Sequence, residues 1–305
     1  MKLLFILSVF TMAGIYSPPS FGQEMQNDDL VISLFNNLYS LHFRDAKNDL
    51  SKISKGNINP DMKDICIANY HWWYIVTLEE NSDHKAKMLD ALDSIIERHK
   101  HSYQENIDPD AIFALGHAYA YKTRLDMHEG NYLKGVKNLN FAGKYLELIL
   151  PRAEENIKYK LLAGLYHYIA GSILERYPVF RPLFVFAPDI QTEKGLKYLK
   201  DCSLDPHPLI SVEASYFIMR VNNQVTENNI QADQIVCMLQ KKFPENIYFS
   251  SYRVTILADD GRHEEALREY KKLCQQNKSG QISWSQYSFI LEKTKKHLRK
   301  KKIKF

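Results

Sequence analysis

The residues best suited to chemistry in this 305-residue chain are its histidines, its four cysteines and one aromatic run. His99 and His101 stand one residue apart at a predicted helix end, so their side chains point in different directions. They could share a metal ion only with a third ligand, and no cysteine–histidine spacing typical of a zinc site supplies one. We therefore expect no bound metal and predict that both histidines lie on the surface.

The cysteines at positions 66, 202, 237 and 274 could form disulfides in an oxidising compartment. The last three are spaced 35 and 37 residues apart, which would place them at similar levels on successive helices. Such positions on packed helices lie about 8 to 10 Å apart, whereas a disulfide needs Cα atoms within about 7 Å. We predict buried free thiols that fill apolar space.

The aromatic run His71-Trp72-Trp73-Tyr74 could stack on a sugar ring. Adjacent aromatic side chains on a helix point around it, so at least two of them should belong to the core. The chain contains no P-loop, G-x-G-x-x-G, nucleophile elbow or H-E-x-x-H motif. We expect a protein without cofactor or catalytic activity; an active site assembled from separate helices is the less favoured alternative.

Five segments share one spacing, a small residue followed four positions later by a large one. The small residue lets a second helix approach closely, and the large residue fills the groove on the same face. The last three of these anchors are 37 and 34 residues apart, a period typical of stacked helical hairpins. The pairs are Ala46/Leu50, Gly135/Leu139, Gly195/Leu199, Ala232/Val236 and Ala266/Tyr270.

The segment 244–276 carries the clearest copy of this repeat. Its residues Gly261, Ala266 and Tyr270 match the Gly-x-x-x-x-Ala-x-x-x-aromatic signature, so the chain resembles the tetratricopeptide-repeat (TPR) family. The resemblance covers residues 190–280 well and the rest loosely, because the earlier copies are degenerate. It implies an all-α fold, a right-handed superhelical array of antiparallel helix hairpins, in an exported bacterial protein.

Apolar periodicity and capping residues predict about twelve or thirteen helices and no strand. Pro60 stands where a first-turn proline belongs. The segment 160–171 is apolar on nearly all sides, which predicts a central helix. Prolines at positions 178, 182 and 188 exclude a regular helix from the segment 176–190, which we interpret as an insertion between two helices of one repeat.

The two ends of the chain differ from the predicted helical domain, residues 23–292. The apolar run Leu3–Ile15 is shorter than the roughly 20 residues that span a bilayer, and small residues follow it, so residues 1–22 predict a signal peptide. Export predicts a periplasmic or secreted protein, for which nucleic acid is not an expected partner. Residues 293–305 form a basic tail, either a frayed helix end or a contact for anionic lipid. If the eight basic residues of this tail and Lys2 are left out, the chain has 31 basic residues and 36 acidic ones.

The resemblance also implies where a partner would bind, because the first helix of each TPR hairpin lines the concave face. Polar and aromatic side chains along that face suit an extended peptide or a partner helix, although the groove could also be merely solvated. We expect a non-catalytic protein-interaction or scaffolding module of the bacterial cell envelope, whose partner is another envelope protein or peptide. Counting back from Gly135 and Ala266 places His117, Arg124, His128, Tyr248, Thr255 and Asp259 on this face.

Attachment to a membrane surface is the alternative function. The apolar loop 179–186 contains Phe180, Phe184 and Phe186, which could dock a partner or dip into an anionic lipid surface beside the basic tail. The same loop could instead pack into the groove of the solenoid. Liposome flotation with and without residues 293–305 tests the membrane hypothesis.

Overall fold

The computed structural model describes residues 21–78, 81–100, 109–184, 189–276 and 282–303. Over these residues the protein is all-helical, with no strand, as predicted. None of the helices described is long and apolar enough to cross a membrane. The α-helices are α1 (Phe21–Tyr39), α2 (Phe43–Lys55), α3 (Pro60–Thr77), α4 (Ser82–His99), α5 (Pro109–His128), α6 (Tyr132–Ile149), α7 (Ile157–Arg176), α8 (Thr192–Cys202), α9 (Pro208–Gln224), α10 (Asn229–Lys242), α11 (Ile247–Asp259), α12 (His263–Leu273) and α13 (Trp284–Lys300), with two 3₁₀ segments, η1 (Leu150–Arg152) and η2 (Pro178–Phe184).

Each odd-numbered helix from α1 to α11 packs against the helix that follows it in the chain. The five small anchor residues lie in α2, α6, α8, α10 and α12, and all of them are buried. Gly195 shows why a small residue is needed: a Cβ atom there would lie 2.4 Å from the backbone nitrogen of Tyr168 in α7. The predicted spacing therefore marks the close approach between paired helices.

Asparagine side chains begin several of these helices. Asn59, Asn156 and Asn246 accept hydrogen bonds from backbone N–H groups in the first turns of α3, α7 and α11. Gly130 and Gly261 have φ values of 79° and 76° in the turns before α6 and α12, a conformation that costs glycine little. Local sequence thus determines where the helices begin and turn.

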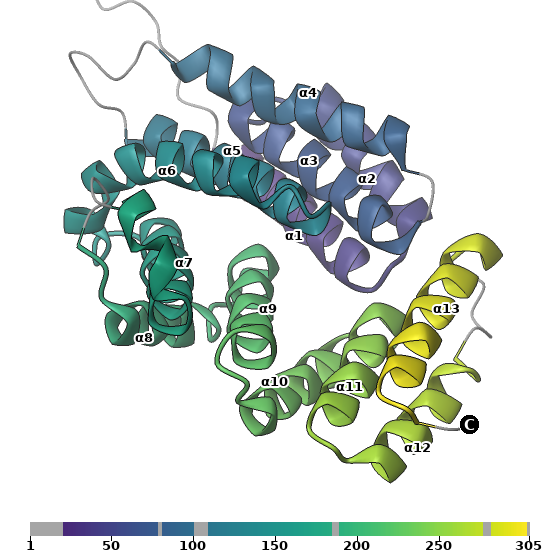
Figure 1. Ribbon diagram of the computed structural model, residues 1–305. Helices are drawn as coiled ribbons and strands as arrows, with labels where there is room; N and C mark the ends of the chain where they lie inside the picture. The colour runs from purple at the N-terminus through teal and green to yellow at the C-terminus, as the bar shows by residue number, and fades with distance from the viewer. Residues whose placement is uncertain (1–20, 79–80, 101–108, 185–188, 277–281, 304–305) are drawn as a thin grey trace, which may run out of the picture.

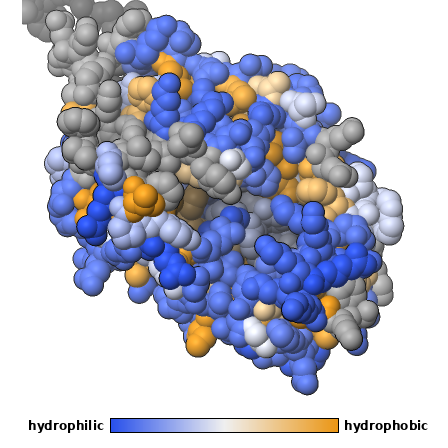
Figure 2. All heavy atoms as spheres, viewed as in Figure 1, coloured by the Kyte–Doolittle hydropathy of each residue, from blue (hydrophilic) through white to orange (hydrophobic). Residues whose placement is uncertain are grey.

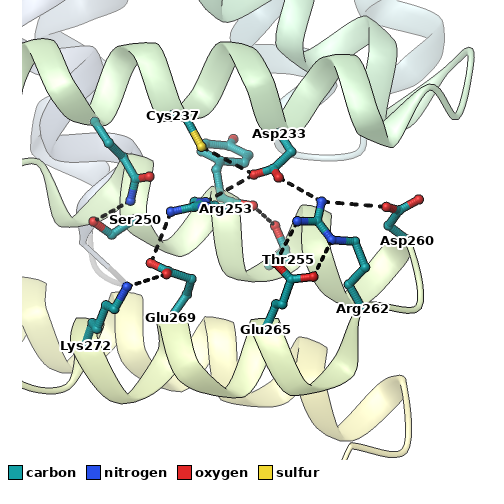
Figure 3. A network of polar contacts seen from close by, with 12 residues as sticks. Asp233, Cys237, Ser250, Arg253, Thr255, Asp260, Arg262, Glu265, Glu269 and Lys272 are labelled. Atoms are coloured by element: carbon teal, nitrogen blue, oxygen red, sulfur yellow. Dashed lines mark hydrogen bonds and ion pairs between the residues drawn. The ribbon is translucent and has the colours of Figure 1, made fainter.

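A polar network holds α10, α11 and α12 together (Figure 3). Asp233 of α10 accepts hydrogen bonds from Arg253 at 3.1 Å and from Arg262 at 2.8 Å. Arg262 also pairs with Glu265 at 2.7 Å. These groups are partly exposed, so each pair adds little stability, but together they bring three helices to one carboxylate cluster.

The helix pairs follow an arc whose two ends approach each other (Figure 1). Helix α1 contacts α9, and α13 contacts α3. Asn246 donates a hydrogen bond of 2.7 Å to the backbone carbonyl of Tyr39 at the end of α1. Gln286 of α13 donates to the hydroxyl of Thr77 at 3.1 Å. The first helices of the chain therefore cover part of the concave side.

The C-terminal basic segment is not separate from the helical domain. Helix α13 continues through residue 293, and Leu298 and Ile303 are buried. His297 and Lys301 lie 3.0 and 2.8 Å from the carboxylate of Asp259 in α11. The apolar face of α13 packs on the helical domain, so the helix continues past the predicted boundary at residue 292. Its end lies against α11.

The predicted insertion lies between α7 and α8 and contains η2. The side chain of Val179 is 78% exposed. Residues 185–188, including Phe186, lie outside the described residues, as do the side chains of Phe180 and Phe184. Residues 1–20 also lie outside them, and the predicted signal-peptide cut after Gly22 falls in the first turn of α1.

Candidate functional site

The six residues expected on the concave face lie on α5 and α11, but they differ in exposure. His117 and Tyr248 are only 4% and 5% exposed, and the side chain of Arg124 is 8% exposed. These three side chains lie in the interior and cannot contact an extended peptide in this structure. In contrast, His128 is exposed, and Thr255 and Asp259 are half-buried. We call these six residues the predicted stripe; it has a buried inner half, His117, Arg124 and Tyr248, and an accessible outer half.

The inner half is built around a buried ion pair between α5 and α9. Arg124 donates a hydrogen bond of 2.9 Å to the carboxylate of Glu213, which also accepts one from the hydroxyl of Tyr39 at 3.4 Å. Burial alone would lower the pKa of Arg124, but the charge of Glu213 outweighs it and raises the pKa. The guanidinium therefore stays charged and links α1, α5 and α9 through Glu213.

Aromatic rings surround the Arg124 guanidinium. Its carbon atom Cζ lies 4.4 Å from the ring centroid of Trp72 and 4.8 Å from that of Tyr216, distances typical of cation–π contacts. Sequence reasoning did not select Glu213. The available signal was a carboxylate in the mostly apolar stretch 208–221, where an unpaired charge would be costly.

A cluster of tyrosines and Arg220 lies beside this ion pair. The hydroxyl of Tyr252 lies 3.1 Å from that of Tyr216 and 3.2 Å from that of Tyr248. Arg220 donates to the Tyr216 hydroxyl at 3.0 Å, to the Tyr252 hydroxyl, and to the side-chain oxygen of Gln224. Burial alone would raise the pKa of Tyr216, but the charges of Arg220 and Arg124 lower it.

His128 on α5 and Lys293 on α13 lie within electrostatic range of Arg220 on α9, and together these helices form a rim beside the cluster. On α5, His128 stands edge-on to Trp72, with 5.6 Å between ring centroids. On α13, the side chain of Lys293 is exposed, but partial desolvation by the surrounding protein and then the positive charge of Arg220 lower its pKa. Figure 2 shows a hollow in the surface between the N-terminal helices and the helices α9 to α13. We call the group Arg220, His128 and Lys293 the cationic mouth.

Asp259, on the outer half of the stripe, holds α13 in place. Burial alone would raise the pKa of its carboxyl group, but hydrogen bonds from His297, Lys301 and Asn223 lower it to about 2. Its carboxylate is therefore engaged by the protein itself. Thr255 donates its hydroxyl to the carbonyl of Tyr252 on its own helix.

The other residues suited to chemistry have structural contacts. Trp72 and Trp73 are buried and Tyr74 is half-buried, as predicted for the aromatic run. His71 lies 2.8 Å from His84 between their Nδ1 atoms, and burial lowers the pKa of His71 to about 4. His99 contacts the carboxylate of Asp61 at 2.7 Å and is half-buried, which corrects the surface prediction.

The remaining predictions concern metal ligands and the four cysteines. The part of the chain that the structure describes contains no group of three or more histidine, cysteine or acidic residues that could hold a metal ion. All four cysteines are free, and Cys66 and Cys202 are buried as predicted. Cys237 is half-buried. Cys274 is exposed because it follows the last residue of α12, so the prediction of a buried thiol was wrong there.

These contacts describe a partly closed arc in which an ion pair and a tyrosine cluster lie among buried rings beside the cationic mouth. They do not by themselves identify a relative. The sequence matches no protein-family model, and no curated protein or solved structure shows significant similarity to it.

Proposed function

We propose that the protein is a non-catalytic binding module of the bacterial cell envelope, exported by its N-terminal signal peptide. Its scaffold would be a TPR-like superhelical array of antiparallel hairpins. The observation that carries the proposal is the division of the predicted stripe: Arg124 is tied to Glu213, whereas His128 and Thr255 remain accessible on separate helices. The partner would be another envelope protein or peptide.

A preorganised rim favours such a role, because binding then costs little conformational entropy. The contacts Arg124–Glu213 and Asn246–Tyr39 link helices that are distant in the chain, so the rim is held from both halves. Since the inner half of the stripe is filled, the partner would present a helix end or a loop to the rim, not an extended segment along it.

Site-specific photo-crosslinking in the native cells tests this proposal. A photoreactive amino acid would replace His128 or Thr255, and exposed Lys197 on α8 would serve as the control position. We expect links to one envelope protein from positions 128 and 255 but not from position 197. The same links should disappear when His128→Glu is added to the position 255 variant. Identical links from all three positions, or none from 128 and 255, would reject it.

The membrane-surface alternative has less support. The exposed Val179 lies in η2, whereas the exposed lysines of the basic segment lie on α13, on the opposite side of the arc (Figure 1). A single flat membrane would have to contact both regions. Flotation with anionic liposomes tests the hypothesis, and lipid association lost when the exposed residues Lys296, Lys300 and Lys302 are replaced by glutamine would restore it.

A further inference from the structure

Arg220 differs from the other guanidinium in this interior, because its hydrogen-bond partners in the described structure are all neutral. Arg124 has the carboxylate of Glu213 at 2.9 Å. Arg220 instead donates to two tyrosine hydroxyls and to the amide oxygen of Gln224, at 2.6 Å for the last. Its ring neighbours are Tyr216 and Tyr252, with centroids 5.7 and 5.2 Å from its Cζ atom. A partly buried charge in neutral surroundings is costly unless an anion is supplied.

The nearby carboxylates already have cationic partners. Glu213 binds Arg124, Glu129 binds Lys85 at 2.5 Å, and Asp259 binds His297 and Lys301. Lys293 adds a second positive charge at the same mouth, whereas the imidazole of His128, with its pKa lowered to about 4, is neutral near pH 7 and can donate a hydrogen bond. Burial and then the charges of Lys293 and Arg220 lower the pKa of His128, which means that these groups lie within electrostatic range of one another. The cationic mouth therefore has an excess of positive charge.

We propose that the cationic mouth binds a small molecule through an oxyanion group, a phosphate or a carboxylate. Arg220 is the main ligand-binding residue. Its Nε and one amino group share the amide oxygen of exposed Gln224, at 3.1 and 2.6 Å, and two oxygens of such a group would take this edge of the planar fork when Gln224 turns away. Lys293 and exposed His128 flank it from α13 and α5. Tyr216 and Tyr252 lie behind the guanidinium and restrict its position through their hydroxyls.

The size of the ligand follows from the closure of the concave side. Beyond the mouth, Tyr248 and His117 are buried, and the contacts of α1 with α9 and of α3 with α13 occupy the space where a peptide chain would run. On the face drawn in Figure 2 the hollow is open to solvent. Arg220 is half-buried and the Gln224 side chain that it binds is exposed, so a small anion can reach the guanidinium from solvent. This inference goes beyond the proposed function, since it requires no protein partner.

Calorimetric titration of the purified mature chain with inorganic phosphate and with citrate, at constant ionic strength, tests the site. We expect saturable binding of at least one of them. Arg220→Gln and Lys293→Gln should each weaken it about tenfold or more, the loss expected when a charge-assisted hydrogen bond is removed. The matched control is Lys296→Gln, an exposed lysine on the same helix, which should change affinity less than twofold.

Binding of phosphate alone would support a phosphorylated ligand, and binding of citrate alone a polycarboxylate. The proposed site would be rejected if neither Arg220→Gln nor Lys293→Gln weakened binding. It would also be rejected if no saturable binding were observed. If Arg220→Gln fails to fold by circular dichroism, exposed Lys293 decides the outcome. The absorbance band of ionised tyrosine at neutral pH, lost in Tyr216→Phe, would also overturn it, because the phenolate would then be the missing anion. Failure of the crosslinking test leaves this inference intact.

Discussion

At the residue scale, the first prediction concerns the stability that the ion pair between Arg124 and Glu213 provides. Arg124→Met removes the cationic partner of the buried Glu213 carboxylate and leaves it with tyrosine hydroxyls such as that of Tyr39, at 3.4 Å. We expect the free energy of unfolding to fall by about 3 to 5 kcal/mol, as for other broken buried pairs. Adding Glu213→Gln removes the stranded charge, so the double variant should lose less. Urea denaturation of the four proteins measures this, and strictly additive losses would contradict it.

His117 makes a second prediction at this scale. Its Nε2 atom is buried without a hydrogen-bond partner in the described structure, and burial, followed by the charge of Arg124, lowers the pKa of His117 to about 3. The unfolded chain takes up this proton near pH 6.5, whereas the folded protein does not until about pH 3. The unfolded state therefore binds more protons in that window, and stability falls as the pH falls.

Substituting His117→Phe removes this proton uptake and keeps a ring against Tyr121, which stacks on His117 at 4.4 Å. Between pH 7 and pH 5, the variant should lose about 2 kcal/mol less unfolding free energy than the unmodified protein. Urea denaturation at the two pH values measures the difference. Equal losses in both proteins would show that His117 is already protonated in the folded state.

At the element scale, the approach of α8 to α7 depends on Gly195. Gly195→Ala places a Cβ atom against the backbone of Tyr168 and Cβ of His167, neither of which can move freely. We expect a loss of about 1 to 3 kcal/mol in the free energy of unfolding. The control is Gly116→Ala on α5, where the nearest atom is a terminal methyl group of Leu162 at 3.1 Å. That change should be near neutral, because alanine favours helix; similar losses at both positions would contradict the packing argument.

At the scale of the whole molecule, Asn246 joins the two ends of the arc. Its oxygen caps α11, and its nitrogen donates to the Tyr39 carbonyl. Asn246→Asp keeps an oxygen for the cap but loses the donor, so unfolding free energy should fall by about 1 to 3 kcal/mol. Asn59→Asp is the control, since Asn59 caps α3 at an exposed position. Thermal or urea unfolding should show a small change there, and equal effects would argue against closure as a source of stability.

The sequence by itself determined the helical class, the positions of most helix starts and the small anchor residues. These features are local: a cap such as Asn59 acts within one turn, and the spacing of Ala266 and Tyr270 describes one face of one helix. The same local character explains the errors. The basic composition of residues 293–305 suggested a tail separate from the helical domain. Composition does not show that Leu298 and Ile303 lie on an apolar face that is buried in the structure.

Only the tertiary structure decided that the concave side is partly closed and which side chains meet there. Arg124 and Glu213 are 89 residues apart, and Asn246 and Tyr39 are 207 residues apart. A repeat spacing identifies the face that packs, but the curvature of a helical array is the sum of small rotations between successive units. Small differences at each junction decide whether the ends meet. The burial of His117 and Tyr248 therefore depends on the whole arc.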